Sequence, residues 1–309
     1  MGEPARNLLI VHSSGYEDIS DWDEVKRRIE AQAPDIEVRI ANNFAKNSVT
    51  ARWQIKRPSL VFSASHLAEF RPLGGTLYVG HQLTKLEQFE RLARRGLPTP
   101  QTMRLTPEAV TALAQWGPYV VVKPPALAKG VRVQLVAARD VAARLDELTR
   151  NGPMLVQPYV EHSVDGCPTS YRVLTLFGRV LCCHLTRWDA PRASLDEIAA
   201  SPQGTIATNT REVGCVRELS NDAEVIAFAE QAQAAFPECA VLGVDVVRET
   251  PTGKLQILEV NPEGLTWHFS SPVARTELPA EFVRGLYTQF NALDRTAQLL
   301  IEKTRAEAS

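Results

Sequence analysis

Two acidic residues and one amide in a short predicted hairpin carry the strongest chemical signal in this sequence. Residues 241–264 read VLGVDVVRETPTGKLQILEVNPEG, which is typical of two β-branched strands joined by a Pro/Gly turn. Asp245 lies within the first strand, and Glu259 and Asn261 share one face near the end of the second. Carboxylate and amide oxygens suit Mg²⁺, which is usually shared with substrate phosphates. The hairpin therefore indicates a magnesium site.

The register of this hairpin decides whether the three side chains converge. If the loop spans residues 250–254, Glu249 pairs with Leu255 and Asp245 lies directly opposite Glu259. Two neighbouring carboxylates repel each other and resist the loss of water, so we expect a positive charge between them. A register one residue off would turn Asp245 away and remove the site.

An exposed sheet face with charges that do no chemistry is the alternative interpretation of the same residues. Leu255 and Ile257 precede Glu259 at two-residue intervals, so strict alternation predicts that they share a face with Glu259 and Asn261. We therefore expect this face to be largely buried, which argues against the exposed alternative.

Two lysines stand at the edges of predicted elements. Lys85 lies in the first turn of a helix whose start is marked by the capping box of Thr84 and Glu87. Lys123 ends the apolar run YVVV and precedes two prolines. Any one lysine is most often a solvated side chain, whereas phosphate oxygens would suit both.

A weaker signal lies in residues 155–162, LVQPYVEH, where a buried strand runs into a turn. Backbone groups of Tyr159 and Val160 could bind the edge of an adenine ring there. By itself the pattern favours an ordinary strand and turn.

The elements around these residues alternate between strands and helices, which predicts an α/β fold. A strand–helix–strand opening is followed by a capped helix, a strand pair around Lys123, a hairpin turning at Phe177–Gly178, an amphipathic helix capped by Asn221 or Ser220, and one or two closing helices. The opening has too few glycines for a dinucleotide fingerprint.

Composition excludes several classes of partner. Lys and Arg number 34 and Asp and Glu 36, so the net charge of -2 gives no case for nucleic acid or an anionic membrane as the main partner. Five cysteines without a C-x-x-C spacing favour reduced thiols and a cytoplasmic location over disulfides or zinc. The N-terminal apolar run LLIV is too short for a signal peptide or a membrane span.

The order of Lys85, Lys123, VQPYV, SYRVLTLFGRV, LTR, GVDVV and LEVNPEG resembles the ATP-grasp superfamily. It is most similar to carboxylate–amine ligases of the RimK and D-alanine–D-alanine ligase type, over about residues 85–271. The resemblance implies two α+β subdomains that clasp ATP, preceded by a small Rossmann-like domain. The implied units are 1–83, 84–155 and 156–309.

The resemblance also implies roles for individual residues around the nucleotide. Lys85 and Lys123 would hold the phosphates, Lys129 would add a contact from a glycine-poor lid, and Asp165, or else Glu161, would meet the ribose. The implied adenine contacts are Gln157, Tyr159 and Val160. The implied metal ligands are Asp245, Glu259 and Asn261, which would hold Mg²⁺, with two ions and Mn²⁺ as a substitute.

Further implied residues surround the reacting groups. Arg172 and Arg187 match the family's arginines near the γ-phosphate and acyl phosphate, and Asn209 and Arg211 would lie near the reacting carboxylate. The implied substrate contacts are Gly264, His268, Ser270 and Ser271. Ser170 stands where many relatives carry an acid.

The resemblance implies an ATP-dependent ligase that joins a carboxylate to an amine, of amino acids or small peptides, through an acyl phosphate. One alternative is an ATP-grasp phosphotransferase acting on a hydroxyl, and another is a nucleotide-binding regulatory module without catalysis. The predicted partners are small-molecule carboxylates and amines, and a homodimer is the commonest assembly by base rate.

Overall fold

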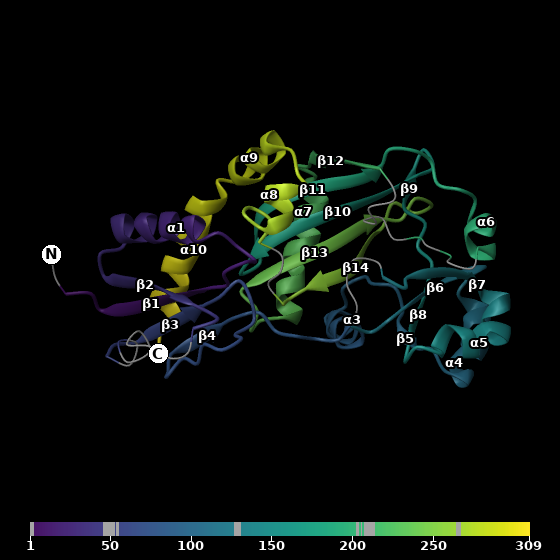
Figure 1. Ribbon diagram of the computed structural model, residues 1–309, viewed down its shortest axis with the longest axis horizontal. Coiled ribbons are helices and arrows are strands. Elements are labelled where there is room, and N and C mark those ends of the chain that lie inside the picture. Colours follow the sequence, from purple (N-terminus) through teal and green to yellow (C-terminus); the bar gives the residue numbers. More distant parts are fainter. Residues whose placement is uncertain are drawn as a thin grey trace.

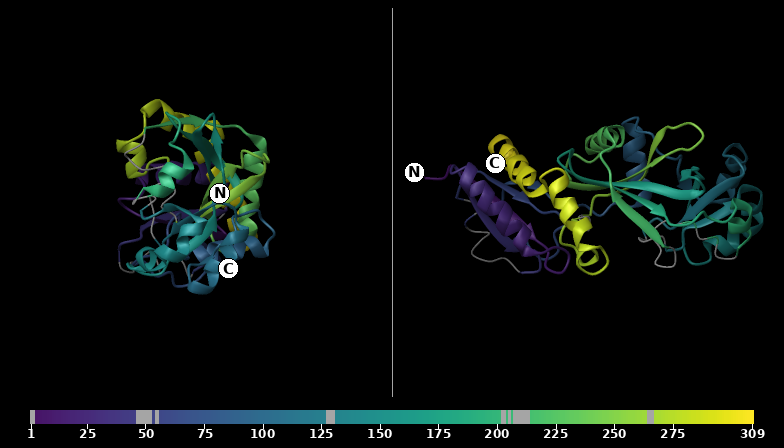
Figure 2. Two further views of the ribbon diagram at one scale, coloured as in Figure 1. Left: turned by 90° about the vertical axis from the view of Figure 1, so that its right-hand side faces the viewer. Right: turned by 90° about the horizontal axis from the view of Figure 1, so that it is seen from above.

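The computed structural model describes most of the chain. Figures 1 and 2 show an elongated molecule in which one sheet lies at each end and a third lies between them. No helix in the described ranges combines the length and apolarity that crossing a membrane requires. The described residues are 3–45, 53, 56–126, 131–201, 204, 206, 214–263 and 267–309.

The first sheet is parallel, in the order β2-β1-β3-β4. Helix α1 (Ile19–Gln32) connects β1 to β2, and Asp18 caps it by accepting a hydrogen bond from the Ser20 amide. Trp22 and Ile29 lie on its buried face, and the predicted strand–helix–strand opening is confirmed. The strands are β1 (Arg6–His12), β2 (Ile36–Asn42), β3 (Ser59–Phe62) and β4 (Thr76–Tyr78).

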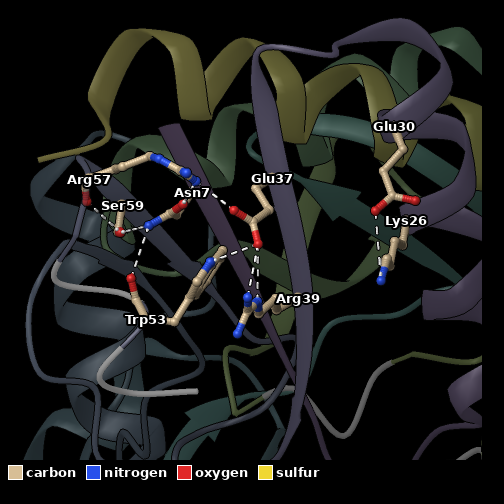
Figure 3. A network of polar contacts seen from close by, with 8 residues as sticks. All are labelled: Asn7, Lys26, Glu30, Glu37, Arg39, Trp53, Arg57 and Ser59. Carbon is tan, nitrogen blue, oxygen red and sulfur yellow. Dashed lines mark hydrogen bonds and ion pairs between the residues drawn. The ribbon is translucent and has the colours of Figure 1, made fainter. Parts of the chain in front are cut away.

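Glu37 on the outer strand β2 is the centre of a polar network that secures the edge of this sheet (Figure 3). Its carboxylate accepts hydrogen bonds from Arg57 Nη1 at 2.5 Å and from Trp53 Nε1 at 2.8 Å. The Arg39 guanidinium lies 4.5 Å from the centre of the Trp53 ring. Side chains that hydrogen-bond to the Glu37 carboxylate therefore cover this edge of the sheet.

The C-terminal helix α10 (Ala292–Glu307) packs on the first sheet, although it lies at the opposite end of the chain (Figure 1). Leu300 belongs to the same core as Trp22. The amide of Ser309 donates to the Ser59 carbonyl at 3.2 Å, and the Ser59 amide donates back at 3.0 Å. The third predicted unit, 156–309, therefore includes a helix that packs on the first sheet and on α1, as well as on β11.

The second sheet is antiparallel, in the order β5-β8-β6-β7. Helices α4 (Pro107–Ala112) and α5 (Val141–Thr149) contribute to the core on one face, and α6 (Leu195–Ala200) packs against the other. The predicted strand pair around Lys123 is confirmed as β6 and β7. The strands are β5 (Met103–Arg104), β6 (Tyr119–Lys123), β7 (Gln134–Ala137) and β8 (Leu155–Pro158).

The third sheet is antiparallel, in the order β12-β11-β10-β13-β14, with β9 paired to β10. Phe177 and Gly178 turn the β10–β11 hairpin with positive φ of 48° and 73°, as a two-residue primed turn requires, and the predicted hairpin is confirmed. The strands are β9 (Ser163–Val164), β10 (Cys167–Leu176), β11 (Arg179–Trp188), β12 (Cys215–Leu219), β13 (Val241–Arg248) and β14 (Leu255–Asn261).

Helices α3 (Lys85–Arg94) and α7 (Ala223–Glu230) cover one face of the third sheet. The cap of α7 is Asp222, whose Oδ1 accepts hydrogen bonds from two amides of the first turn, so the predicted cap at Asn221 or Ser220 is wrong by one or two residues. The two closing helices before the C-terminus are α9 (Ala280–Gln289) and α10, preceded by the short α8 (Pro272–Thr276).

Leu300 offers a test of how much the C-terminal helix contributes to the first sheet. Leu300→Ala removes a fully buried side chain from the shared core, so we expect the free energy of unfolding to fall by about 2–5 kcal/mol. Glu302→Ala, an exposed change on the same helix, should leave stability within about 0.5 kcal/mol of the wild type. Urea denaturation of both variants measures the difference, and equal midpoints would contradict this packing.

Candidate active site

A β-bulge in the β13–β14 hairpin sets the position of the acidic residues. Next to the turn, Arg248 pairs with Leu255, so the predicted pairing of Glu249 with Leu255 is wrong by one residue. The register then shifts between Asp245 and Val246, because β14 contains one extra residue. Beyond the shift, Asp245 lies opposite Glu259, as predicted.

The bulge also changes which residues share a face. Leu255, Ile257 and Val260 all pack into the core beneath α3 and α7, although the last two are three residues apart. The prediction that Leu255 and Ile257 share a face with Glu259 and Asn261 is therefore wrong. The extra residue inverts the alternation and turns the polar side chains to the opposite face.

Both carboxylates are paired with cations. Arg172 on β10 lies opposite Asp245 and binds it through two contacts, Nε to Oδ1 at 2.5 Å and Nη2 to Oδ2 at 3.0 Å. Lys85 Nζ forms an ion pair with Glu259 Oε1. The expected positive charge beside the carboxylates is confirmed, and the chain itself supplies it.

Lys85 is placed by the start of α3. Thr84 Oγ1 accepts from the Glu87 amide and the Glu87 carboxylate accepts from the Thr84 amide, so the predicted capping box is confirmed. Lys85 is the first residue of the helix, and its own amide donates to the Pro125 carbonyl at 2.9 Å. This bond ties the helix start to the segment that follows Lys123.

Lys123 ends β6 with its ammonium group buried, 4.5 Å from the centre of the Phe89 ring. Burial lowers the pKa of Lys123 to about 7, and the charge of Lys85 adds to this effect, whereas Glu259 and Asp245 oppose it. The last strand residue of β6 therefore shares one electrostatic cluster with the carboxylates of the third sheet.

Asp245 is the acid most affected by this cluster. Burial raises its pKa to about 6, and the neighbouring charge of Glu259 adds to the rise, although Arg172 and Lys85 act in the opposite direction. A proton therefore competes with any cation for this carboxylate in mildly acidic solution.

The predicted adenine segment is already hydrogen-bonded in part. The Gln157 side chain donates to Thr102 Oγ1 at 2.5 Å, and the Tyr159 amide donates to the Tyr119 carbonyl at 3.1 Å. The Val160 carbonyl lies 2.7 Å from His162 Nδ1. The adenine contact stays a prediction that depends on the remaining groups of this segment.

The two alternatives for the ribose contact differ in position. Asp165 is exposed at the tip of the turn between β9 and β10, with a φ of 51°. Glu161 directly follows Val160 and is fixed by the Arg192 guanidinium at 2.5 Å and by the Ser163 amide at 3.0 Å. Of the two, only Glu161 is held beside the predicted adenine segment.

Arg187 is not brought into the cluster. Arg172 lies opposite His184, whereas Arg187 lies opposite Thr169 three residues along the strands. Alternation therefore places Arg187 on the other face of the sheet. Four further predicted residues, Lys129, Asn209, Arg211 and Gly264, lie outside the described residues.

Two predicted substrate residues have structural partners. Ser270 Oγ donates to Asp21 Oδ2 at 2.6 Å and accepts from the Asp18 amide at 3.0 Å. Ser271 caps α8 by accepting from the Ala274 amide at 3.2 Å. A third predicted substrate residue, His268, has its ring centre 6.5 Å from that of His184. His184 lies opposite Arg172, which lies opposite Asp245 on the next strand.

Sequence reasoning missed two residues on the Arg172 face. His184 lies directly opposite Arg172, and Arg217 on β12 pairs with Thr186 on that same face. Alternation along LCCHLTR and CVREL was the available signal, but only the strand order shows that the two runs are adjacent.

The polar set fits Mg²⁺ in its chemistry. In the described part of the chain, no three His, Cys, Asp or Glu side chains gather closely enough to hold a metal ion. Asp245 and Glu259 with Asn261 supply two carboxylates and an amide, and the Asn261 amide nitrogen donates to the Gly243 carbonyl at 3.5 Å. Mg²⁺ usually takes one or two carboxylates and completes its shell with water and phosphates.

Comparison with known proteins decides the family. The profile of the ATP-grasp domain matches residues 83–266, more than half of the chain. The chain belongs to the ATP-grasp family. This confirms the predicted resemblance and the predicted fold class. No curated protein sequence matches this ATP-grasp protein.

Solved structures share the fold of this ATP-grasp protein at low sequence identity. The ATP-grasp ligase PsnB complexed with a minimal precursor is 18% identical over 98% of this chain and 100% of its own, with a TM-score of 0.57. Macrocyclase MdnC from Microcystis aeruginosa MRC is 14% identical over 96% and 99%, with a TM-score of 0.54. D-alanine–D-alanine ligase from Bacillus anthracis is 15% identical over 97% and 99%, with a TM-score of 0.51.

The raised pKa of Asp245 predicts how metal binding depends on pH. Below about pH 6 the carboxyl group is protonated and must lose its proton to bind a cation. We expect the affinity for Mn²⁺, used as a probe, to fall up to about tenfold per pH unit below pH 6 and to level off above it. Calorimetric titration between pH 5 and 8 measures this. Asp245→Asn should lose the step, and an unchanged affinity across this range in the wild type would contradict the assignment.

The bulge predicts an effect of deleting Leu258. Without the extra residue, either Glu259 enters the core or the strand loses its pairing. We expect the deletion to abolish Mn²⁺ binding and to destabilise the protein by several kcal/mol. Leu258→Ala keeps the chain length and should still bind Mn²⁺. Circular dichroism and Mn²⁺ titration measure both, and metal binding by the deletion variant would exclude this role of the bulge.

Proposed function

We propose that the chain is an ATP- and Mg²⁺-dependent ligase that joins a carboxylate to an amine through an acyl phosphate. The observation that carries the proposal is the cluster of Lys85, Lys123 and Arg172 around Asp245 and Glu259. It combines oxygen ligands for a cation with side chains that bind phosphate oxygens.

The structural relatives support this class of reaction. They include PsnB with Mg and ADP, a D-alanine–D-alanine ligase, and a macrocyclase bound with its precursor peptide. Their substrates range from single amino acids to peptides, so we propose a carboxylate and an amine of an amino acid or small peptide here.

The proposed reaction has two steps. An oxygen of the substrate carboxylate attacks the γ-phosphorus of ATP, and the bond from that phosphorus to the ADP oxygen breaks. The amine nitrogen then attacks the acyl carbon, the bond to the phosphate oxygen breaks, and the amine loses a proton. Bound Mg²⁺ would neutralise the charge that gathers on the phosphates in the first step.

The chain's own residues bind and orient the reactants. Lys85 and Lys123 come from two elements, α3 and β6, and would hold the phosphates from two sides. Lys123 has a pKa of about 7, and a neighbouring phosphate raises this value, since opposite charge favours the protonated form. Arg172 holds Asp245 through two guanidinium contacts, one to each carboxylate oxygen, which fixes the orientation of the carboxylate.

Several finer assignments belong to the proposal. They are the division into units 1–83, 84–155 and 156–309, a pair of metal ions with Mn²⁺ as a substitute, a homodimer, and the roles of the remaining predicted residues. The remaining nucleotide contacts are Lys129, Gln157, Tyr159, Val160 and Asp165. The remaining contacts to the reacting groups are Arg187, Asn209, Arg211, Gly264, His268, Ser270 and Ser271.

Glu259→Gln tests the proposal. It removes one charge from the proposed metal site, so we expect the rate of ADP and phosphate release with suitable amino-acid pairs to fall about 10²–10³-fold. Glu249→Gln, on the exposed turn of the same hairpin, should keep the wild-type rate. Mass spectrometry separates an amide from a phosphorylated product and thus from the phosphotransferase alternative. Absence of nucleotide binding by the wild type would refute the proposal.

A further inference from the structure

A row of polar side chains crosses the third sheet beyond the proposed metal site. The register places Glu259 opposite Asp245, Asp245 opposite Arg172, and Arg172 opposite His184, so the four lie side by side on one face. The strand after this row is β12, at the edge of the sheet, and it carries Arg217 on the same face. The row therefore begins with the acids Glu259 and Asp245 and ends with Arg217, and Arg172 and His184 lie between them.

Arg217 differs from Arg172 in its partners. Arg172 is neutralised by Asp245 through two contacts. Within the described ranges, no carboxylate lies close enough to Arg217 to form an ion pair. Its pairing partner Thr186 lies between His184 and Trp188 along β11. Arg217 thus brings one uncompensated positive charge to this end of the row.

Unused hydrogen-bonding groups surround that charge. His184 is only 8% exposed, and its Nδ1 atom has no hydrogen-bond partner in the described part of the chain. The buried Trp188 Nε1 atom, on a residue of the same strand face, also has no described partner. Buried polar atoms are nearly always hydrogen-bonded in folded proteins, so a polar ligand that reaches this place would find two groups able to bind it.

Aromatic side chains lie around His184 on the same face of the sheet. The ring centres of His184 and His268 are 6.5 Å apart, and Phe282 of α9 lies 5.6 Å from His184 (Figure 1 shows α9 beside β11 and β12). Burial lowers the pKa of both histidines to about 3, and the charges of Arg172 and Arg217 contribute to this. Both rings are neutral near pH 7 and donate or accept hydrogen bonds without adding charge.

We propose that Arg217, His184 and His268 form a subsite for a second carboxylate of the acyl-donor substrate. This inference rests on the proposed function, in which the first carboxylate reacts beside Arg172. One uncompensated guanidinium matches a single negative charge, and the neutral imidazoles complete its hydrogen bonds. The substrate class is therefore a short dicarboxylic acid, or an amino acid with an acidic side chain.

The spacing of the row supports a short connection between the two carboxylates. The strands β10 and β12 are two sheet spacings apart, about 10 Å, and β11 between them carries His184. Asp245 holds the Arg172 guanidinium toward β13, so Arg172 does not shorten that distance. After a hydrogen bond of about 3 Å to a guanidinium at each end, the span that is left corresponds to a chain of a few carbon atoms.

Matched pairs of acyl donors test the subsite. The pairs are glutamate with glutamine, aspartate with asparagine, and succinate with succinamate, supplied with ATP, Mg²⁺ and hydroxylamine as the nucleophile. Hydroxamate and ADP report turnover whatever the natural amine is. We expect the diacid of each pair to have a KM about 10–100-fold lower than its amide, as loss of a charged hydrogen-bond partner implies.

Substitution of Arg217 separates the subsite from the reaction centre. In Arg217→Gln, the KM of the diacids should rise about 10–100-fold while kcat changes less than about threefold, and the KM of the amides should not change. Arg217→Lys should restore part of the preference. Arg179→Gln, an exposed arginine at the start of β11, is the control and should behave as the wild type.

The outcomes separate this inference from the proposed function. Equal KM values for acid and amide, or a preference that survives Arg217→Gln, would overturn the subsite and leave the ligase proposal standing. If no donor produces ADP, the ligase proposal fails, and calorimetry of glutarate binding decides the subsite alone. Binding to the wild type that is lost in Arg217→Gln would support it, and no binding to the wild type would overturn it.

Discussion

The arrangement of this protein depends on holding two carboxylates, Asp245 and Glu259, side by side in a partly buried place. Two like charges at about 4 Å repel by about 4 kcal/mol at an effective dielectric constant near 20. Each acid therefore has its own cation, Arg172 from the neighbouring strand and Lys85 from the start of α3. A bound cation would replace this internal compensation, so the ion-pair network lies where we propose that a metal ion binds.

The same constraint determines where the site lies in the fold. Lys85 and Glu259 join α3 to the third sheet, and Lys123 brings the end of the second sheet to the same charges. Lys123 has no described carboxylate in ion-pair contact with its buried ammonium group, and its pKa of about 7 reflects that burial. A nucleotide phosphate is the type of partner that this geometry lacks, so the junction of the two sheets is suited to ATP.

Much of this site could be predicted from the sequence because its parts are local. The capping box at Thr84, the strand that ends at Lys123 and the pairing of Asp245 with Glu259 all follow from patterns a few residues long. Which residues of β14 face the core could not be predicted. The register next to the turn differs by one residue from the predicted one, and the bulge restores the predicted pairing only beyond Val246. The register difference and the unpredicted bulge cancel for the pairing of Asp245 with Glu259. They do not cancel for the core, because Val260, and not Glu259, shares the face of Leu255 and Ile257.

Contacts between distant segments lie beyond such patterns, and Asp21 is the clearest case. Its carboxylate accepts hydrogen bonds from Trp267 Nε1 at 2.8 Å, from Ser270 Oγ at 2.6 Å and from the Tyr287 hydroxyl at 2.8 Å. These bonds tie α1 to α9 and to the segment that follows β14 and carries His268. A serine that resembles a substrate contact in sequence is thus one of three donors to a buried acid. Because Asp21 lies on α1, this helix helps to position the segment that carries His268, a residue of the proposed subsite.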